Sequence, residues 1–129
     1  MAQVKIYGSR ERLAPRRAAV PAGIHMCVVE ALQLPPDKKF QRFILLERED
    51  FLFPADRSDD YIILEISLFE GRSEDTKKQL ISRLCEQLAR DVGIVATDIE
   101  ITIFETPRHN RGIRGHCDDE LPLSYRVDI

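Results

Sequence analysis

The sequence predicts an α+β fold in which two β-α-β units form a four-stranded mixed sheet with two helices on one face. Two observations predict it. Segments of alternating apolar and polar residues flank stretches with helical spacing, and this strand–helix–strand order occurs twice, over about residues 2–48 and 60–106. Such a crossover pairs its two strands in parallel. We therefore expect one domain, residues 1–129, that ends in a hairpin and a tail.

The first unit opens with a strand at Gln3–Tyr7, where polar and apolar residues alternate. The polar stretch 8–12 is typical of a turn. Pro15 favours a helix start near Ala14, because proline is tolerated in the first turn. Apolar residues then recur at helical spacing, and they are Val20, Ile24, Cys27, Val28, Ala31 and Leu32.

Two residues disturb that helical pattern. Pro21 lacks a backbone donor and clashes with the preceding turn, and Gly23 is also unfavourable inside a helix. We therefore expect a kink or a late helix start there. Pro35 and Pro36 close the segment, and a second strand is expected at Gln41–Glu47.

A loop at residues 49–61 separates the two units, since it is rich in Asp, Pro and Ser. The second unit has strands at Tyr61–Phe69 and Asp98–Glu105. The strands carry apolar residues on much of both faces, yet the helices cover only one. We therefore expect the uncovered sheet face to associate with other copies of the chain.

The helix of the second unit has clear end signals. Gly71 turns the chain, Ser73 is a good N-cap, and Glu74 and Asp75 favour the positive end of the helix dipole. Its apolar face consists of Leu80, Ile81, Leu84, Cys85, Leu88 and Val92. Gly93 follows at the position of a left-handed C-terminal residue.

Composition restricts the class of partner. Hydrophobic residues make up 43%, charged residues 32%, and the net charge is -3, so we expect neither nucleic acid nor a membrane as partner. No apolar run is long enough to span a bilayer, and no signal peptide opens the chain. Cys27, Cys85 and Cys117 are odd in number and far apart, which favours reduced thiols and a cytoplasmic location.

The second half resembles the 4-oxalocrotonate tautomerase family in three stretches, FEGRSEDTKKQLISRLCEQLARDVGI, IEITIFET and RGIRG. That family's subunit has a strand, an EGRS-type turn, an acid-rich helix start, a long helix, a strand and a glycine-rich hairpin. The doubled unit resembles fused members of the tautomerase superfamily, such as malonate semialdehyde decarboxylase and cis-3-chloroacrylic acid dehalogenase. The loop DFLFPADRSDDY is similar to that of an uncharacterised fused branch. The resemblance implies the tautomerase fold and a homotrimer around a central channel.

The resemblance implies that Arg72 holds a substrate carboxylate, since the family's turn arginine has that role. A guanidinium binds a carboxylate through two parallel hydrogen bonds and stays charged at any cellular pH. The adjacent helix N-terminus adds donors for an anion. From the residues alone, an alternative stays open, in which Arg72 is a solvated turn residue or pairs with Glu70, Glu74 or Asp75.

The family's base is an amino-terminal proline, whereas this chain begins Met1-Ala2-Gln3. Removal of Met1, which a small second residue favours, places the Ala2 amine at that position. An unperturbed α-amine has a pKa of about 7.7 to 8.0, and partial burial or a nearby arginine lowers it. Ala2 is therefore the candidate base or imine-forming group. The alternative is a chain start with no chemical role.

Two further positions follow from the resemblance. Decarboxylase-like members place an acid in the loop after the first helix, where this chain reads PPDKKFQ. Asp37 is the candidate that orients a water, although Lys38 occupies the matching position, and the alternative is that Asp37 caps local backbone. Glu100 replaces the family's second substrate arginine, which predicts a substrate different from that of the known tautomerases.

The hairpin supplies more cations. Arg111 falls near the position of the family's aromatic pocket wall. If its side chain points into the pocket, it supplies the positive charge of the second substrate arginine, which is Glu100 in this chain. Arg108 and Arg114 are further candidates. The tail SYRVDI alternates, so we expect it to add as a strand to a neighbouring subunit's sheet edge.

We predict no metal and no cofactor. The spacing H-x6-H-C of His109, His116 and Cys117 matches no zinc pattern, and the chain has no glycine-rich phosphate loop. Two functions remain. The first is a tautomerase-type isomerase acting on a small carboxylate-bearing oxo or enol acid, and the second is a non-catalytic trimer that binds small anions or serves assembly.

Overall fold

The computed structural model describes residues 2–129 and contains the predicted four-stranded mixed sheet. Its strands are β1 (Gln3–Ser9), β2 (Phe40–Leu46), β3 (Ile62–Phe69) and β4 (Ile99–Thr106), in the order β2-β1-β3-β4. β1 pairs in parallel with β2 and β3 pairs in parallel with β4, while β1 and β3 are antiparallel. Each β-α-β crossover thus gives a parallel pair, and the predicted fold class is confirmed.

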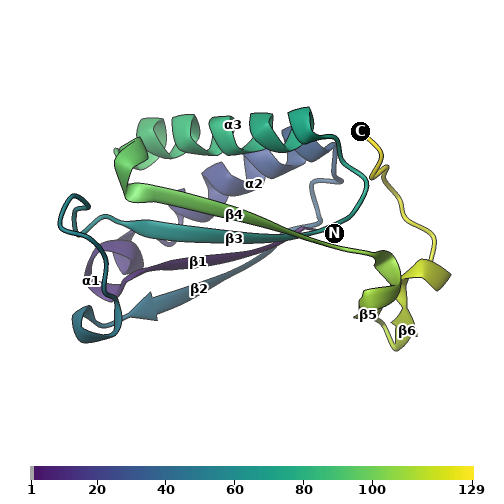
Figure 1. Ribbon diagram of the computed structural model, residues 1–129, viewed down its shortest axis with the longest axis horizontal. Helices are drawn as coiled ribbons and strands as arrows, with labels where there is room; N and C mark the ends of the chain where they lie inside the picture. Colours follow the sequence, from purple (N-terminus) through teal and green to yellow (C-terminus); the bar gives the residue numbers. More distant parts are fainter. Residues whose placement is uncertain (1) are drawn as a thin grey trace.

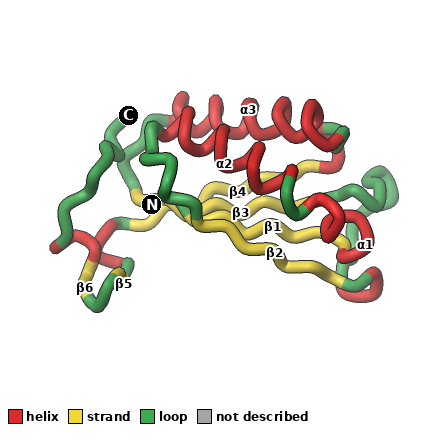
Figure 2. The backbone as a smooth tube through the Cα atoms, turned by 180° about the vertical axis from the view of Figure 1, so that it is seen from behind, coloured by secondary structure: helices red, strands yellow, loops and turns green. Residues whose placement is uncertain are grey.

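Two long helices, α2 (Ala19–Leu32) and α3 (Glu74–Val92), lie on the same face of the sheet, as Figures 1 and 2 show from opposite sides. The polar stretch 8–12 is not the turn that we expected. It extends β1 and then enters the short helix α1 (Arg10–Leu13), because the Ser9 side chain accepts a hydrogen bond from the Arg12 N–H. A 3-10 turn at Ala14–Arg16 leads on to α2.

The late start expected for the first long helix is present. α2 begins at Ala19, so Pro21 falls in the first turn, where its missing N–H has no helical partner to lose. Gly23 has a different role. A Cβ at this position would lie 2.6 Å from Asp91 Oδ2, so the glycine lets α2 approach α3 closely.

The core lies between the sheet and the two helices. Every second residue of β1 and β3 points into it, as the alternating burial of both strands shows. The fully buried side chains include Ile6, Ile24, Leu32, Leu64, Ile66, Leu80, Leu84 and Leu88. Each such side chain contributes about 1.5 to 3 kcal/mol through the removal of apolar surface from water. This core holds the strand ends in fixed register.

The other sheet face is mixed rather than uniformly apolar. Tyr7 donates a hydrogen bond to Glu65, and Arg42 donates to Gln3, so polar pairs occupy its centre. At one end of this face, a row of paired residues crosses the four strands, from Phe40 on β2 to Phe104 on β4. The side chains of Phe40 and Phe104 are 41% and 48% exposed. Apolar surface is therefore concentrated at the outer strands.

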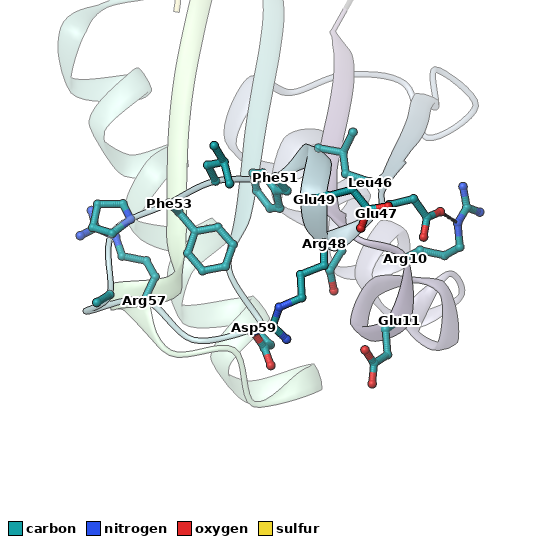
Figure 3. A pocket seen from close by; sticks show the side chains of 14 residues that line it. Arg10, Glu11, Leu46, Glu47, Arg48, Glu49, Phe51, Phe53, Arg57 and Asp59 are labelled. Atoms are coloured by element: carbon teal, nitrogen blue, oxygen red, sulfur yellow. Dashed lines mark hydrogen bonds and ion pairs between the residues drawn. The ribbon is translucent and has the colours of Figure 1, made fainter.

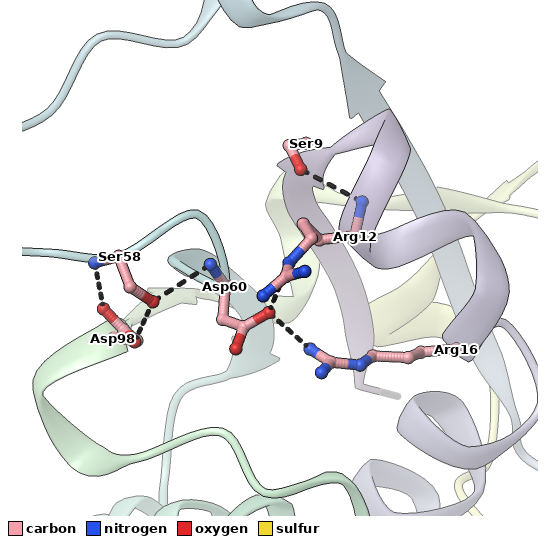
Figure 4. A network of polar contacts seen from close by, with 6 residues as sticks. All are labelled: Ser9, Arg12, Arg16, Ser58, Asp60 and Asp98. Carbon is pink, nitrogen blue, oxygen red and sulfur yellow. Dashed lines mark hydrogen bonds and ion pairs between the residues drawn. The ribbon is translucent and has the colours of Figure 1, made fainter.

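The loop between the units is well organised. It contains a 3-10 turn at Arg48–Asp50 and an aromatic cluster in which Phe51 stacks on Tyr61 at a centroid distance of 5.5 Å. Polar residues fix its end to both units, as Figure 4 shows. The buried Asp98 accepts hydrogen bonds from Ser58, and Asp60 bridges Arg12 and Arg16.

Beyond β4, a small hairpin pairs β5 (Gly112–Ile113) with β6 (His116–Cys117). Its two-residue turn, Arg114 and Gly115, has φ values of 53° and 80°, which is the backbone favoured in tight hairpins. Further 3-10 turns span Ala96–Asp98, Arg108–Asn110 and Asp118–Glu120. Residues 121–129 then run back toward α3 without joining a sheet of this chain. Among residues 2–129, no helix combines the length and apolar character needed to cross a bilayer.

Candidate functional site

The residues predicted to form the site lie at one end of the sheet. Because the two central strands are antiparallel, with Gln3 opposite Ser67, β1 begins where β3 ends. β4 runs parallel to β3 and ends beside it, and the hairpin follows. Ala2, the Arg72 turn and the hairpin are therefore neighbours, as the positions of N, C and β5–β6 in Figure 1 show.

Arg72 is buried, with a relative exposure of 4%. Its Nη1 donates a hydrogen bond to the carbonyl oxygen of Phe69 at 3.3 Å. Its Nε and Nη2 atoms are also buried and have no hydrogen-bond partner among residues 2–129. The interpretation of Arg72 as a solvated turn residue is therefore wrong for this structure.

The acids offered as alternative partners of Arg72 are engaged elsewhere or exposed. Glu74 pairs with Lys78 at 2.7 Å, Asp75 accepts a hydrogen bond from Gln79, and Glu70 is exposed. The guanidinium is thus buried without a carboxylate bonded to it among the described residues.

Burial makes the charge of Arg72 unfavourable. Loss of solvation lowers the pKa of Arg72, and the charge of Glu105 opposes this shift only in part. Glu105 itself is held by Lys77 at 2.6 Å. A buried cation with unpaired donors is a strong site for an anion, because both the charge and the free N–H groups are then satisfied.

Tyr125 covers Arg72, with its ring centroid 5.9 Å from the guanidinium carbon. The Tyr125 hydroxyl is buried and has no hydrogen-bond partner among residues 2–129, and the same holds for the Thr106 hydroxyl. Three side chains near the ends of β3 and β4, those of Arg72, Thr106 and Tyr125, thus have buried polar atoms without a hydrogen-bond partner. Sequence reasoning missed Tyr125, and the signal available was the alternation of the tail.

The N-terminus of α3 is occupied by the tail. Ser73 caps the helix by accepting from the Thr76 N–H. The Ser73 N–H donates to the carbonyl oxygen of Ile129 at 2.8 Å, and the Thr76 hydroxyl donates to the same oxygen at 3.0 Å. The donors that we expected to serve a ligand therefore bind a carbonyl of the chain itself.

A cavity of about 410 Å³ lies next to this cluster. Its lining is largely apolar and consists of Lys38, Phe40, Phe69, Ile113, Arg114, Asp118, Leu121, Pro122, Leu123, Ser124 and Tyr125. Phe69 and Tyr125 both line the cavity and contact Arg72, so the guanidinium lies directly behind the cavity wall. Asp37 is exposed in the loop before β2, where its neighbour Lys38 reaches the cavity.

The hairpin arginines divide into different roles. Arg114 is exposed and lines the cavity. Arg111 lies 4.8 Å from the ring centroid of Phe69, and burial lowers the pKa of Arg111. Arg108 donates to the carbonyl oxygens of Asp118 and Leu121, so it holds the start of the tail.

Ala2 is buried, with a relative exposure of 2%, and its methyl group belongs to the core. Removal of Met1 concerns a residue outside the described ones. Glu100, by contrast, lies near the start of β4 at the opposite end of the sheet. It accepts a hydrogen bond from Arg57 at 2.7 Å, and hydrogen bonds from Tyr61 and Arg57 lower the pKa of Glu100. The charge of Glu100 is thus compensated by Arg57 of the loop.

A larger cavity, of about 510 Å³, is found at that opposite end (Figure 3). Its wall combines Phe51 and Phe53 with charged side chains. Arg10 is bound to Glu47 at 2.6 Å, and Arg57 is bound to Glu100. A third arginine of the wall, Arg48, is exposed, whereas Arg72 is buried. We therefore place the candidate site at the Arg72 end.

Among residues 2–129, one group of side chains could ligate a metal ion, and it lies at the surface. The ligand atoms of Cys117, Asp119 and Glu120 lie within 4.8 Å of one another, and all three residues are exposed. His109 and His116, which sequence analysis considered, are also exposed. This cluster is not part of the Arg72 cavity.

Comparison with known proteins agrees with these features. A family model described as a tautomerase enzyme matches residues 38–114, which is more than half of the chain. The 2-hydroxymuconate tautomerase of Comamonas testosteroni is 35% identical over 57 residues, which cover 44% of this chain and 90% of that protein.

Solved structures share the fold at low identity. Malonate semialdehyde decarboxylase superposes with a TM-score of 0.81 and 19% identity, covering 93% of this chain and 99% of the other. A wild-type fused 4-OT, solved as an asymmetric trimer, superposes with a TM-score of 0.81 and 18% identity, covering 92% and 97%. The fold, the doubled β-α-β unit and the matched segment lead to one conclusion: the chain belongs to the tautomerase superfamily.

Proposed function

We propose that this protein is a proton-transfer enzyme of the tautomerase type, an isomerase that acts on a small oxo or enol acid bearing a carboxylate. The observation that carries the proposal is the buried Arg72, whose Nε and Nη2 atoms have no hydrogen-bond partner among residues 2–129. A carboxylate that accepts from both atoms satisfies the guanidinium and neutralises its charge. The apolar cavity beside Arg72 suits the rest of such a molecule.

The chemistry needs a base near the bound acid. In the keto–enol step, the base takes the enol O–H proton, the oxygen electrons form the C=O bond, and the double-bond electrons take that proton at carbon from the protonated base. We assign this role to the Ala2 amine after removal of Met1, because β1 begins at the Arg72 end of the sheet. We assign to Asp37, which precedes Lys38 in the loop before β2, the role of orienting a water molecule. We assign further contacts with the substrate to Arg111 and Arg114.

We also infer a homotrimer in the cytoplasm. Fused 4-OT proteins with this fold are solved as trimers, and the exposed Phe40 and Phe104 offer apolar surface for association. The three cysteines are free thiols, which suits a reducing compartment. Neither nucleic acid nor membrane is assigned as a partner.

The test is turnover of phenylenolpyruvate and 2-hydroxymuconate by wild type and Arg72→Ala. We expect kcat/KM to fall about ten- to hundred-fold in Arg72→Ala, since a charged hydrogen-bonded contact is lost. Arg90→Ala, on the exposed side of α3, is the matched control and should retain wild-type rates. The intact mass of the purified protein shows whether Met1 has been removed. Retention of Met1 would exclude the Ala2 amine as the base. Absence of turnover in wild type would refute the enzyme assignment.

The second function is a non-catalytic trimer that binds small anions. One observation favours it, namely that the chain carries alanine at position 2 where the family it resembles has a proline. The same assay separates the two. Binding of a carboxylate that depends on Arg72, without turnover, would support the second function.

A further inference from the structure

The tail, residues 121–129, has the alternation of a strand but lies in no sheet of this chain. Its odd-numbered residues, Leu121, Leu123, Tyr125, Val127 and Ile129, are partly buried, and its even-numbered residues are exposed. Residues 121–125 line the cavity of about 410 Å³. Tyr125 thus both lines this cavity and contacts Arg72 with its ring.

The far end of the tail is anchored at few points. The Ile129 carbonyl oxygen accepts from the Ser73 N–H and the Thr76 hydroxyl. The Val127 carbonyl oxygen lies so close to Gly71 that a Cβ there would be 2.8 Å away. Apart from these contacts and the Tyr125 ring, the described tail makes no backbone ladder with the sheet. Such an attachment can open without unfolding the core.

We propose that residues 121–129 form a lid that closes the Arg72 site, with Tyr125 as the gate and the Ile129 backbone oxygen in the place of a ligand oxygen. A carboxylate that reaches Arg72 from the cavity displaces Tyr125, and the donors of Ser73 and Thr76 become available to it. This inference rests on the proposed function, because it takes a carboxylate as the ligand of Arg72. Beyond that function, we infer that the ligand carboxylate competes with residues 121–129 of the same chain for the Arg72 site.

The exchange is favourable for a specific physical reason. The Tyr125 ring brings no negative charge to Arg72, whereas a carboxylate both accepts the N–H donors and pairs with the guanidinium. The closed lid keeps Arg72 dry when no ligand is present, since Tyr125 covers its face. The lid therefore selects ligands that carry an anionic oxygen.

The test uses benzoate as the probe and isothermal titration calorimetry on the full chain. Ile129→Ala trims the partly buried side chain at the anchored end of the tail, and Tyr125→Ala removes the gate. We expect benzoate to bind about three- to ten-fold more tightly to each variant than to wild type, because each change weakens the closed lid without removing a group that binds the carboxylate. Thr97→Val, at an exposed position far from the tail, is the matched control and should bind as wild type does.

A second readout follows the lid directly. Amide hydrogen exchange at Ser73 reports its bond to Ile129, and exchange within residues 123–129 should increase when benzoate is added to wild type. If wild type binds benzoate as tightly as both variants and the tail stays protected, the lid is refuted while the proposed function stands. If neither wild type nor the variants bind benzoate, the lid is refuted, and the proposed function is decided separately by turnover of phenylenolpyruvate and 2-hydroxymuconate.

Discussion

Arg72 is the residue on which the account rests, and its burial has a measurable consequence. Two of its nitrogens lack hydrogen-bond partners among residues 2–129, and each unsatisfied buried group costs about 1 to 3 kcal/mol. We predict that Arg72→Met raises the free energy of unfolding by about 1 to 3 kcal/mol, because an apolar side chain of similar length removes this penalty. Equilibrium unfolding in urea measures this change in the free energy of unfolding. Arg90→Met should change stability by less than about 0.5 kcal/mol.

The opposite result would have a clear meaning. If Arg72→Met lowered stability more than Arg90→Met did, Arg72 would be a structural group with favourable contacts. It would then not be a side chain kept for a ligand.

The cysteines differ in reactivity for a physical reason. Burial raises the pKa of Cys27 to about 11, and burial also raises the pKa of Cys85, whereas Cys117 is exposed. Since the thiolate is the reactive species, we predict that iodoacetamide at pH 8 modifies Cys117 first, Cys85 more slowly and Cys27 only on unfolding. Peptide mass spectrometry over time gives the order. Early labelling of Cys27 would contradict its place in the core.

At the residue scale, the sequence allowed identification of those polar residues whose neighbours in the sequence indicate their position. Arg72 stands at a strand–helix turn, so its position was predictable from the turn and the cap. Tyr125 was not, because its contact with Arg72 joins residues more than fifty positions apart. The pairing of Glu100 with Arg57 was missed for the same reason.

At the element scale, α3 matches its prediction, because Ser73 and Gly93 are strong local end signals. The first unit was harder. The polar residues of α1 were assigned to a turn, since a helix of one turn on the surface has no apolar face to reveal it. The late start of α2 was expected, but the close packing that Gly23 permits depends on α3 and cannot be read locally.

Gly71 links the turn after β3 to the tail. Its φ of 133° disfavours a side chain, and a Cβ would lie 2.8 Å from the Val127 carbonyl oxygen. We predict that Gly71→Ala lowers the free energy of unfolding by about 1 to 3 kcal/mol and increases amide exchange in residues 123–129. Thermal unfolding and hydrogen exchange measure the two effects.

Gly93→Ala is the matched control for Gly71→Ala. Gly93 also has a positive φ, of 70°, but a Cβ there would meet nothing within 4 Å. It should lose some stability without any change in the tail. Equal tail exchange in the two variants would show that Gly71 does not hold the tail in place.

At the scale of the whole molecule, the antiparallel arrangement of the two units places their strand–helix turns at opposite ends of one sheet. Each end has a cavity, but only one of them adjoins the unpaired Arg72. The fold class was predictable from the repeated strand–helix–strand order. The choice between the two ends was not, because it depends on ion pairs between distant segments such as Arg10 and Glu47.

Association is the remaining prediction at this scale. Phe104 is 48% exposed on the sheet face that the helices leave uncovered. We predict that wild type sediments as a trimer and that Phe104→Lys shifts the protein toward monomer without loss of helical circular dichroism. Ser82→Lys, at an exposed position of α3 on the other side of the molecule, is the control for added charge. A wild-type monomer at micromolar concentration would contradict the trimer.

The most direct measurement is a crystal structure of wild type grown with benzoate. We predict a carboxylate that accepts hydrogen bonds from Arg72 Nε and Nη2 at about 2.7 to 2.9 Å, with Tyr125 moved off the guanidinium. Benzoate bound only at other places, with Arg72 still covered by Tyr125 and bonded to Phe69 alone, would contradict it.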